Sequence, residues 1–429
     1  MLAAFPIVAV GGLVLWLGVD VPYWDGWDWL ARHYDGREAT LVERYWPLHF
    51  GHRMFVPFFV VRGIYALTHV DMRALLVATW ATQLATLWVL SLLLPPDWTR
   101  RQRLFTVAGL SALLFAITLW PAWIDHRQFA SGLATMCSVI ALWAIARASG
   151  GWGFAVALAA TIAASLSYFQ GTLTWLLWAP LVYRRFPGWP AAVWTGAAAI
   201  VLSLHGLELV ARDAMQLEPS AFGTPLFALA VLGSPLNLSA SPVVSALAAL
   251  AGLAAFGALA VTDAGNGGRL DHRTSTPWLW LGLWGMSIAL ATAVGRSAEL
   301  PLTEALARRY ATTVMPFWCS LLALASTAVV PASRSTSESG GRSIFAARAV
   351  VVSLSAGLLL GTVRSVSDRR FFDFGERLQM GRSCLVEDRA DDACLELLFP
   401  DASRIRGLVP VLRQHGAAFA GSDEPAGEG

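Results

Sequence analysis

The sequence predicts an all-α polytopic membrane protein with about eleven transmembrane helices. Of its 429 residues, 56% are hydrophobic and only 14% are charged, and the mean hydropathy is +0.55. Apolar runs of about 17 to 25 residues, the length that a helix needs to cross a bilayer, recur along the chain. The net charge is +2 and no basic run is present, which excludes a nucleic-acid-binding protein.

The apolar runs place the membrane spans at residues 2–19, 74–94, 104–121, 129–147, 153–169, 172–183, 190–210, 240–262, 277–294, 311–331 and 345–363. The first run has no basic stretch before it and no A-x-A site after it, so a retained span is favoured over a cleaved signal peptide. The run at 172–183 is short, and 224–236 is a candidate re-entrant or interfacial helix. The number of spans depends on these two segments.

Arginines in the short connections predict the orientation. They fall on alternate connections: Arg100, Arg101, Arg103, Arg147, Arg184, Arg185, Arg269, Arg273, Arg334, Arg342 and Arg348. Because positively charged loops stay in the cytoplasm, we expect the N-terminus inside, and residues 20–73, 296–310 and the tail from 364 outside. A composition rich in Ala, Leu and Trp and without lysine indicates a GC-rich bacterial genome. The expected location is the bacterial inner (cytoplasmic) membrane, with an extracytoplasmic C-terminus.

Three segments are expected along the chain: a transmembrane domain at 1–366, a small extracytoplasmic helical domain at 367–415 and a disordered tail at 416–429. The first outer loop, 20–73, is too long for a simple connection and is expected to carry helices that lie along the membrane surface. Its apolar stretch 53–67 contains Arg53 and Arg62, which are costly at the bilayer centre and tolerable at the interface. A full span at 53–67 is the alternative.

Two cysteines of the tail, Cys384 and Cys394, lie ten positions apart. A disulfide between them is predicted, because an extracytoplasmic compartment permits oxidation. Two free thiols are the alternative. Cys137 and Cys319 lie within spans and are expected to be small buried residues.

Ionisable residues are nearly absent from the predicted spans and gather in the outer connections instead. The outer set comprises Asp25, Asp28, His33, Asp35, Glu43, Arg44, His49, His52, Arg53, Asp125, His126, Arg127, Arg296, Arg308 and Arg309. A coupled transporter usually keeps ionisable groups at mid-membrane, so this distribution favours an active site at the outer surface.

The segment PYWDGWDW at 22–29 places Asp25 and Asp28 three residues apart, on one face of a helical turn. Such a pair can act as a general base, as metal ligands or as both; an aromatic membrane belt with exposed carboxylates is the alternative. In HFGHR, His49, His52 and Arg53 would share one helix face, and the histidines are candidate metal ligands, although H-E-x-x-H is absent. Nucleophile-elbow, Walker and dinucleotide motifs are absent too.

Arginines of the 296–310 connection are candidate phosphate ligands. Arg296, Arg308 and Arg309 could clamp a lipid phosphate, because guanidinium groups pair bidentately with phosphate oxygens. Arg308 is also placed to pair with Glu304 at i,i+4, in which case it only supports the helix surface.

Four short motifs together resemble the GT-C class of polytopic glycosyltransferases, and within it a group of bacterial membrane proteins. They are YWDGWD (23–28), HFGHR (49–53), SYFQGTLTWLLWAP (167–180) and GRSAELPLTEALARRYATTVMPFW (295–318). The resemblance implies a polyprenyl-phosphate sugar as donor, a glycan, lipid or protein as acceptor, and an acidic residue of the first outer loop as catalytic base or metal ligand. The acidic pair usual in the class is replaced here by D-x-x-D, which leaves the roles of Asp25 and Asp28 open. A divalent metal ion is a candidate cofactor.

The predicted reaction is inverting glycosyl transfer at the outer membrane surface. Asp25 is the first choice for the base, and Asp28 is the second, as orienting partner or metal ligand. Contacts with the membrane-bound substrate are expected from Trp24, Trp27, His49, His52, Arg53, Arg296, Arg309 and Tyr310. A lipid or glycan transporter and a non-catalytic membrane assembly protein are the alternatives.

Overall fold

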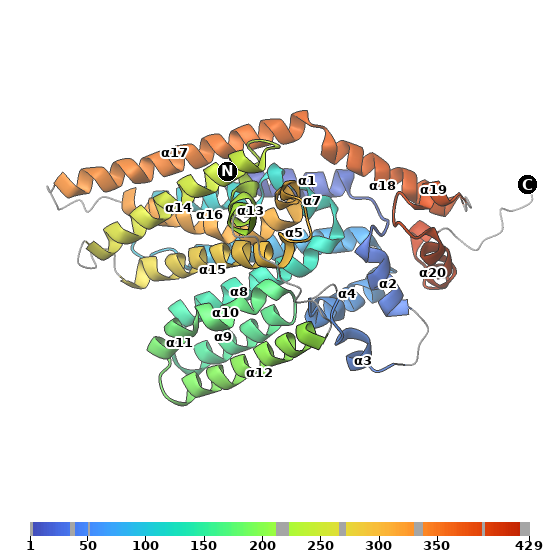
Figure 1. The fold of residues 1–429 in the computed structure, drawn as a ribbon, viewed down its shortest axis with the longest axis horizontal. Helices are drawn as coiled ribbons and strands as arrows, with labels where there is room; N and C mark the ends of the chain where they lie inside the picture. Colours follow the sequence, from blue (N-terminus) through green and yellow to red (C-terminus); the bar gives the residue numbers. More distant parts are fainter. Residues whose placement is uncertain are drawn as a thin grey trace, which may run out of the picture.

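The computed structural model describes residues 3–34, 39–49, 52–211, 223–265, 272–329, 338–387 and 391–420. Within these ranges the regular structure is helical, apart from a single antiparallel bridge between His49 and His52 (Figure 1). The predicted all-α class is therefore confirmed for the described part of the chain.

Eight helical segments are long and apolar enough to cross a membrane, which makes the chain a multi-pass helical membrane protein. They are α5 (Met72–Leu92), α6 (Arg100–Leu114) continued through α7 (Trp120–Ile124), α8 (Phe129–Arg147), α12 (Trp189–Ala211), α14 (Pro242–Gly265), α15 (His272–Arg296), α16 (Arg308–Val329) and α17 (Glu338–Ser367). Helices α8 and α16 are the most buried of the eight, whereas α12 and α17 lie at opposite edges of the bundle (Figure 1).

The remaining predicted spans are shorter helices. The segments 2–19 and 153–169 form α1 (Ala4–Leu17) and α9 (Gly150–Ser165). The segment 172–183 divides into α10 (Leu173–Leu177) and α11 (Ala179–Arg185), because Pro180 cannot continue the hydrogen bonding of a preceding helix and begins a new one. A helix of 14 residues such as α1 is about 21 Å long, less than the bilayer core of about 30 Å.

The segment 224–236 lies inside the bundle. It forms α13 (Gly223–Gly233), which packs between α14 and α15 and buries Phe227 and Val231. Its backbone carbonyls take part in the packing, because the indole of Trp318 on α16 donates a hydrogen bond of 2.8 Å to the carbonyl of Leu232. Such cross-helix hydrogen bonds hold transmembrane helices together where apolar lipid supplies no hydrophobic drive.

Small residues let the central helices approach closely. At Gly285 of α15, an added Cβ atom would lie 2.7 Å from the backbone nitrogen of Phe317 on α16. Ser320 of α16 in turn donates a hydrogen bond of 2.5 Å to the carbonyl of Trp278 on α15. Close backbone approach at small residues is the usual packing of membrane helices.

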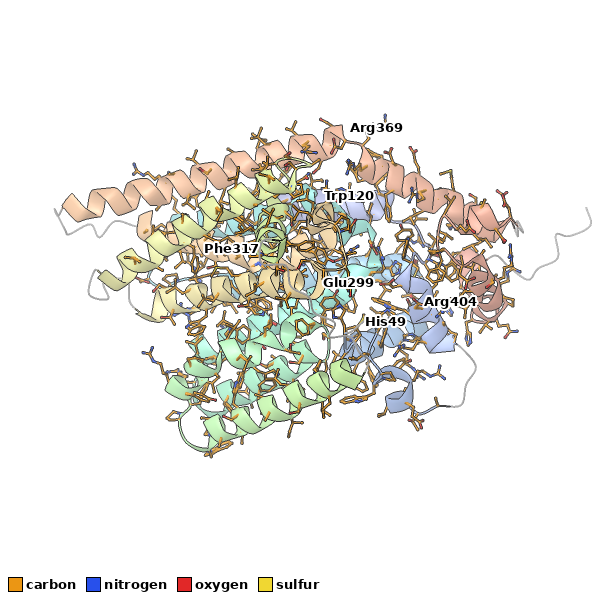
Figure 2. The ribbon with its side chains drawn as sticks, in the orientation of Figure 1. His49, Trp120, Glu299, Phe317, Arg369 and Arg404 are labelled. Carbon is orange, nitrogen blue, oxygen red and sulfur yellow. A yellow bond between two sulfur atoms is a disulfide. The ribbon has the colours of Figure 1, made fainter. Side chains whose placement is uncertain are left out.

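The first loop and the C-terminal helices meet at one end of the bundle. The loop carries α2 (Asp25–Tyr34), α3 (Leu41–Tyr45) and α4 (Phe55–Thr68), and the C-terminal segment carries α18 (Arg370–Val386), α19 (Asp392–Leu395) and α20 (Ala402–Gln414). Helix α2 packs beside α20 (Figure 1), and the N–H group of Trp24 donates a hydrogen bond of 2.8 Å to the carbonyl of Leu398. His49 and Arg404 lie at this end, whereas Phe317 lies within the bundle (Figure 2).

The C-terminal segment confirms one prediction and corrects another. Cys384 on α18 and Cys394 on α19 form a disulfide, while Cys137 and Cys319 are free and buried. The chain is ordered beyond residue 415, because Ala418–Ala420 form a 3-10 helix whose Phe419 is fully buried. Residues 421–429 of the predicted disordered tail lie outside the described residues.

The arginine-bearing connections lie at the other end of the bundle. Arg147 donates a hydrogen bond of 2.7 Å to the carbonyl of Leu93 at the end of α5, and Arg185 donates one of 3.2 Å to the carbonyl of Ala148. Helix α5 begins beside the first loop, where Asp20 accepts a hydrogen bond of 2.8 Å from the N–H group of Met72. The length of α5 therefore separates these arginines from the first loop.

Candidate functional site

Asp25 begins helix α2 directly after a residue in an unusual conformation. Trp24 has φ 46°, in the left-handed region that costs a bulky side chain about 1 to 2 kcal/mol. The hydrogen bond from its N–H group to Leu398 holds this conformation. Asp25 and Asp28 both lie in the first turn of α2, where the helix dipole favours negative charge.

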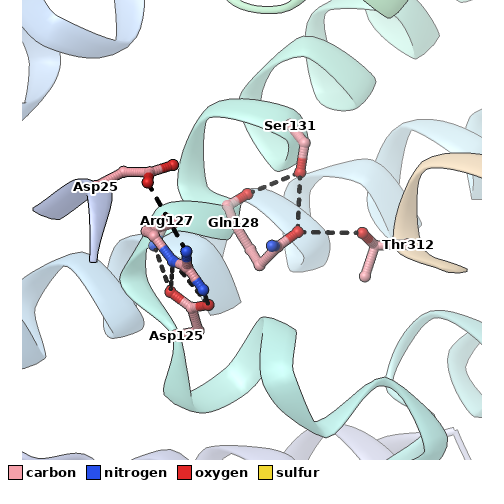
Figure 3. A network of polar contacts seen from close by, with 6 residues as sticks. All are labelled: Asp25, Asp125, Arg127, Gln128, Ser131 and Thr312. Carbon is pink, nitrogen blue, oxygen red and sulfur yellow. Dashed lines mark hydrogen bonds and ion pairs between the residues drawn. The ribbon is translucent and has the colours of Figure 1, made fainter. Parts of the chain in front are cut away.

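The short 3-10 helix η2 (His126–Gln128), between α7 and α8, faces Asp25. Asp125 accepts two hydrogen bonds from Arg127, of 2.8 Å from Nε and 2.6 Å from Nη2. This bidentate pair fixes the guanidinium, whose Nη1 atom lies 4.0 Å from Oδ1 of Asp25 (Figure 3). Gly26 permits the approach, because a Cβ atom there would lie 2.1 Å from Nε2 of His126.

The surroundings of Asp25 make it a stronger base than an ordinary aspartate. Burial raises the pKa of Asp25, the Arg127 guanidinium opposes this increase, and the neighbouring charges of Asp125 and Asp28 add to it. Asp125 differs: although burial favours its neutral form, Arg127 holds its pKa below the usual value. Two carboxylates beside one guanidinium thus differ in basicity, and the one that remains more basic is Asp25.

The carboxylate of Asp28 forms an ion pair with Arg404. Its Oδ1 atom lies 2.5 Å from Nη2 of Arg404 on α20. Burial raises the pKa of Asp28, and Arg404 opposes this increase. Asp28 therefore ties the C-terminal helices to the first loop, whereas Asp25 has no ion-pair partner as close as this among the described residues.

Arg296, Arg309, Tyr310 and Asp25 all contribute to the electrostatic environment of Tyr168. The phenol of Tyr168, which follows α9, interacts electrostatically with all four of these residues, and burial raises its pKa to about 12. Arg296, at the end of α15, and Arg309, at the start of α16, keep side-chain exposures of 41% and 51%, so both guanidinium groups are accessible to a ligand. Three helices, α2, α15 and α16, thus contribute one basic carboxylate and two accessible cations whose charges act on Tyr168.

The ion-pair partners of Arg296 and Arg309 both lie in the connection between α15 and α16. Arg296 lies 3.5 Å from Glu299, and Arg309 lies 3.1 Å from Glu304. The predicted pair between Glu304 and Arg308 is wrong, because residues Leu302–Leu306 form a 3-10 helix and α16 begins only at Arg308, so i,i+4 spacing does not align the two side chains.

A polar contact joins η2 to the start of α16. Gln128 lies in η2, and the hydroxyl of Thr312 on α16 donates to its Oε1 at 3.5 Å (Figure 3). The hydroxyl of Ser131 donates to the carbonyl of Gln128 at 3.0 Å, and Gln170 donates to the carbonyl of Ser131 at 2.8 Å. The elements that carry Arg127, Arg309 and Tyr168 are therefore held in register.

Several predicted substrate contacts are engaged within the protein. Trp27 is fully buried and packs edge-on against Phe419, so its ring is not available to a sugar, whereas Trp24 is 44% exposed. Arg53 is 2% exposed, donates a hydrogen bond of 2.8 Å to the carbonyl of Trp46 and stacks on the indole of Trp46. These contacts make Trp27 and Arg53 parts of the scaffold.

His49 and His52 do not share a helix face, which corrects the prediction. They face each other across the antiparallel bridge, each backbone N–H group donating to the other's carbonyl. His49 accepts a hydrogen bond of 3.2 Å from the indole of Trp29, and His52 stacks on Tyr168 with ring centres 4.0 Å apart. Burial lowers the pKa of His49 to about 3 and that of His52 to about 4, so both rings are neutral at pH 7. The stacking contact with His52 holds the ring of Tyr168 in place.

Among the described residues, no group of three His, Cys, Asp or Glu side chains comes together to hold a metal ion. Asp35 lies outside the described residues. Two residues near Asp25 and the arginines in this electrostatic environment, Arg127 and Tyr168, carried only weak signals in the sequence. In the sequence, Arg127 is one of many charged residues in the outer connections. Tyr168 lies in the segment SYFQG (167–171) and carries no charge that would mark it.

Comparison of the chain with protein-family models, with curated proteins and with solved structures finds no match.

Proposed function

We propose that the protein is a glycosyltransferase that moves a sugar from a polyprenyl-phosphate donor to an acceptor hydroxyl at the outer face of the membrane. The observation that carries this proposal is that a basic carboxylate, Asp25, held 4.0 Å from Arg127, and two exposed guanidinium groups, Arg296 and Arg309, all act electrostatically on Tyr168. A lipid-linked sugar phosphate presents a phosphate and a sugar carbon side by side, and this arrangement offers a cation for the first and a base beside the second.

The residues divide the reaction between them. Asp25 removes the proton of the acceptor hydroxyl as its oxygen attacks the anomeric carbon, and the bond from that carbon to the phosphate oxygen breaks with inversion. The departing lipid phosphate carries the bonding electron pair, and Arg296 and Arg309 stabilise the charge that develops on it. Arg127, held by Asp125, keeps the Asp25 carboxylate oriented.

The proposed orientation has eleven spans, a cytoplasmic N-terminus and an extracytoplasmic C-terminus. It is supported by the contact of α2 with α20, since the first loop and the C-terminal helices must then share a side. The hydrogen bonds of Arg147 and Arg185 at the far end of α5 agree with a cytoplasmic location for those arginines.

Polar groups inside the described spans favour the enzyme over the transporter. Thr79, Thr86 and Thr135 each donate a hydrogen bond to a carbonyl of their own helix, and Gln170 donates to Thr135 at 2.8 Å. The threonine hydroxyls are thus bonded within their own helices. The bond between Gln170 and Thr135 joins α8 to the chain after α9, as an interhelical contact of the kind that stabilises membrane bundles.

A transfer assay tests the proposal. The purified full chain in liposomes is supplied with a panel of radiolabelled polyprenyl-phosphate sugars and a membrane glycolipid extract, and labelled product is measured. Wild-type protein is expected to transfer label, and Asp25→Asn to be slower by about 100-fold to 10,000-fold, as for loss of a general base. Asp373→Asn, at an exposed position on α18, is the matched control. Equal rates for Asp25→Asn and wild type would refute the role of Asp25.

A further inference from the structure

A second group of arginines lines a cavity of about 320 Å³ beside the start of α16. The cavity is formed where four elements meet: the segment after the 3-10 helix η4 (Ser234–Leu236), the 302–306 connection, the end of α17 and the start of α18. Its charged lining residues are Arg308, Arg364, Arg370, Glu304 and Asp368.

Arg308 and Arg309 are neighbours in the sequence but belong to different sites. Successive residues of a helix project about 100° apart. Arg309 therefore lies with Tyr310 near Tyr168, whereas Arg308 donates hydrogen bonds from Nη1 to the carbonyl of Thr118 at 2.8 Å and to the hydroxyl of Ser365 at 3.4 Å. These bonds and the face of Trp120, 5.7 Å away, fix the Arg308 guanidinium at the cavity.

The charges of the cavity are unbalanced. The positive charges of Arg364 and Arg370 both repel that of Arg308. Asp368 pairs with Arg364 at 3.5 Å, and Glu304 is bound by Arg309 from outside the cavity at 3.1 Å. In the part of the chain that the structure describes, Arg370 has no ion pair or hydrogen bond with a carboxylate. The cavity therefore attracts an anion.

Neutral polar groups complete the lining. Asn237, in the left-handed conformation at φ 48°, donates a hydrogen bond of 2.9 Å to the hydroxyl of Ser365, and Ser239 and Thr303 border the same space. Hydroxyl and amide groups beside arginines suit a phosphate attached to a hydroxylated group, because arginine forks match phosphate oxygens and the neutral groups bond to hydroxyls.

We propose that this cavity binds a phosphate ester, carried either by a lipid headgroup or by a small soluble molecule. The site is distinct from that of Asp25, because Asp25, Arg127, Arg296 and Arg309 do not line the cavity. A series of ring contacts, Trp120 with Phe374 at 5.7 Å and Phe374 with Tyr23 at 5.0 Å, connects the ring beside Arg308 to the ring beside Arg127. Phosphate binding at this cavity does not depend on transfer activity, so the inference holds whether or not the chain is a glycosyltransferase.

Binding of two phosphate probes tests the inference. Full-length Arg296→Gln protein in detergent micelles, in which the Asp25 site is weakened, is titrated with dihexanoyl phosphatidic acid and with glycerol 1-phosphate by calorimetry. Dihexanoylglycerol, which lacks the phosphate, is the ligand control. Each phosphate ester that reaches the cavity is expected to bind, and adding Arg364→Gln or Arg370→Gln is expected to weaken its binding at least 10-fold. Adding Arg377→Gln, exposed on α18 and lining no part of the cavity, removes the same charge and is expected to leave the affinity unchanged.

The outcomes distinguish the source of the phosphate. Tighter binding of phosphatidic acid assigns the cavity to lipid headgroups, and equal binding of glycerol 1-phosphate assigns it to soluble esters. Failure of both probes to bind, equal binding of dihexanoylglycerol, or wild-type affinity in the Arg364 and Arg370 variants would overturn the inference.

Discussion

Burial and pairing give the two carboxylates of the first loop different chemistry. Asp25 lies 4.0 Å from a guanidinium that Asp125 already holds, while Asp28 lies 2.5 Å from Arg404. Burial raises the pKa of both carboxylates, but only Asp28 is held in a close ion pair, whereas the counter-charge of Asp25 is more distant. The spacing D-x-x-D cannot show this difference, because both partners come from remote parts of the chain.

At the same scale, the accessible arginines are predicted to bind the donor phosphate. Replacing Arg309 with Ala removes a charge-assisted hydrogen bond and is expected to weaken polyprenyl-phosphate binding by about 1 to 3 kcal/mol. Lys should restore only part of this loss, since it keeps the charge without the fork. Tritium-labelled polyprenyl phosphate bound to purified protein gives the measurement, with Arg348→Ala, exposed on α17, as control. Unchanged affinity in Arg309→Ala would show that Arg309 only forms its ion pair with Glu304 and does not bind the donor.

Asp20 is predicted to make stability depend on pH. It is 6% exposed, and burial raises its pKa from 3.8 to about 6, with the charge of Asp71 adding to the increase. A raised carboxyl pKa means that folding favours the protonated form, so the stability it contributes is full below pH 3.8 and is lost as the pH rises through 6. Asp20→Asn, neutral at every pH and still able to accept from Met72, should therefore be more stable than wild type at pH 7.5 by about 1 to 3 kcal/mol.

Thermal unfolding followed by tryptophan fluorescence at pH 4.5 and pH 7.5 checks this prediction. The difference between Asp20→Asn and wild type should largely disappear at pH 4.5, and Asp373→Asn should show none at either pH. A difference of the same size at both values would mean that the effect comes from packing, and that Asp20 does not titrate on folding.

At the scale of elements, hydropathy located most helices and missed where they break. Eight of the apolar runs match long helices within a few residues, because a bilayer fixes span length. The break between α10 and α11 follows from Pro180, which the sequence contains but the apolar run conceals. The burial of α13 depends on neighbours that are distant in the chain, and no local pattern predicts it.

The ion pair between Asp28 and Arg404 is predicted to fasten α20 to α2. Arg404→Ala leaves a partly buried carboxylate without its cation, and should destabilise the protein by about 1 to 3 kcal/mol and increase amide exchange in α20. The double variant with Asp28→Asn should recover part of this loss, because the uncompensated charge is then absent. Unfolding free energies of the four proteins form the cycle. Additive effects would show that the two side chains do not stabilise each other.

For the whole molecule, the arrangement of charge follows from the membrane. Arg147 and Arg185 hydrogen-bond to carbonyls at one end of the bundle, and α2 and α20 pack together at the other. The alternation of arginines predicted this separation, since it reports the sidedness of connections. The combined effect of Asp25, Arg296 and Arg309 on Tyr168 could not be predicted from this alternation, because it depends on the order in which the helices pack.

The orientation of the chain in the membrane predicts which single cysteines an impermeant reagent can label. The native thiols give little background, because Cys137 and Cys319 are buried and Cys384 and Cys394 are paired. Val42→Cys on α3, which is 57% exposed, should react in intact cells with a maleimide that cannot cross the membrane.

Two further positions complete this test. Gln414→Cys, exposed at the end of α20, should react like Val42→Cys, because the first loop and the C-terminal helices share a side. Arg101→Cys, exposed at the start of α6, should react only after the cells are permeabilised. Reaction of Arg101→Cys in intact cells, with protection of Val42→Cys and Gln414→Cys, would invert the orientation. The Asp25 carboxylate would then face the cytoplasm, and the donor would have to present its sugar there.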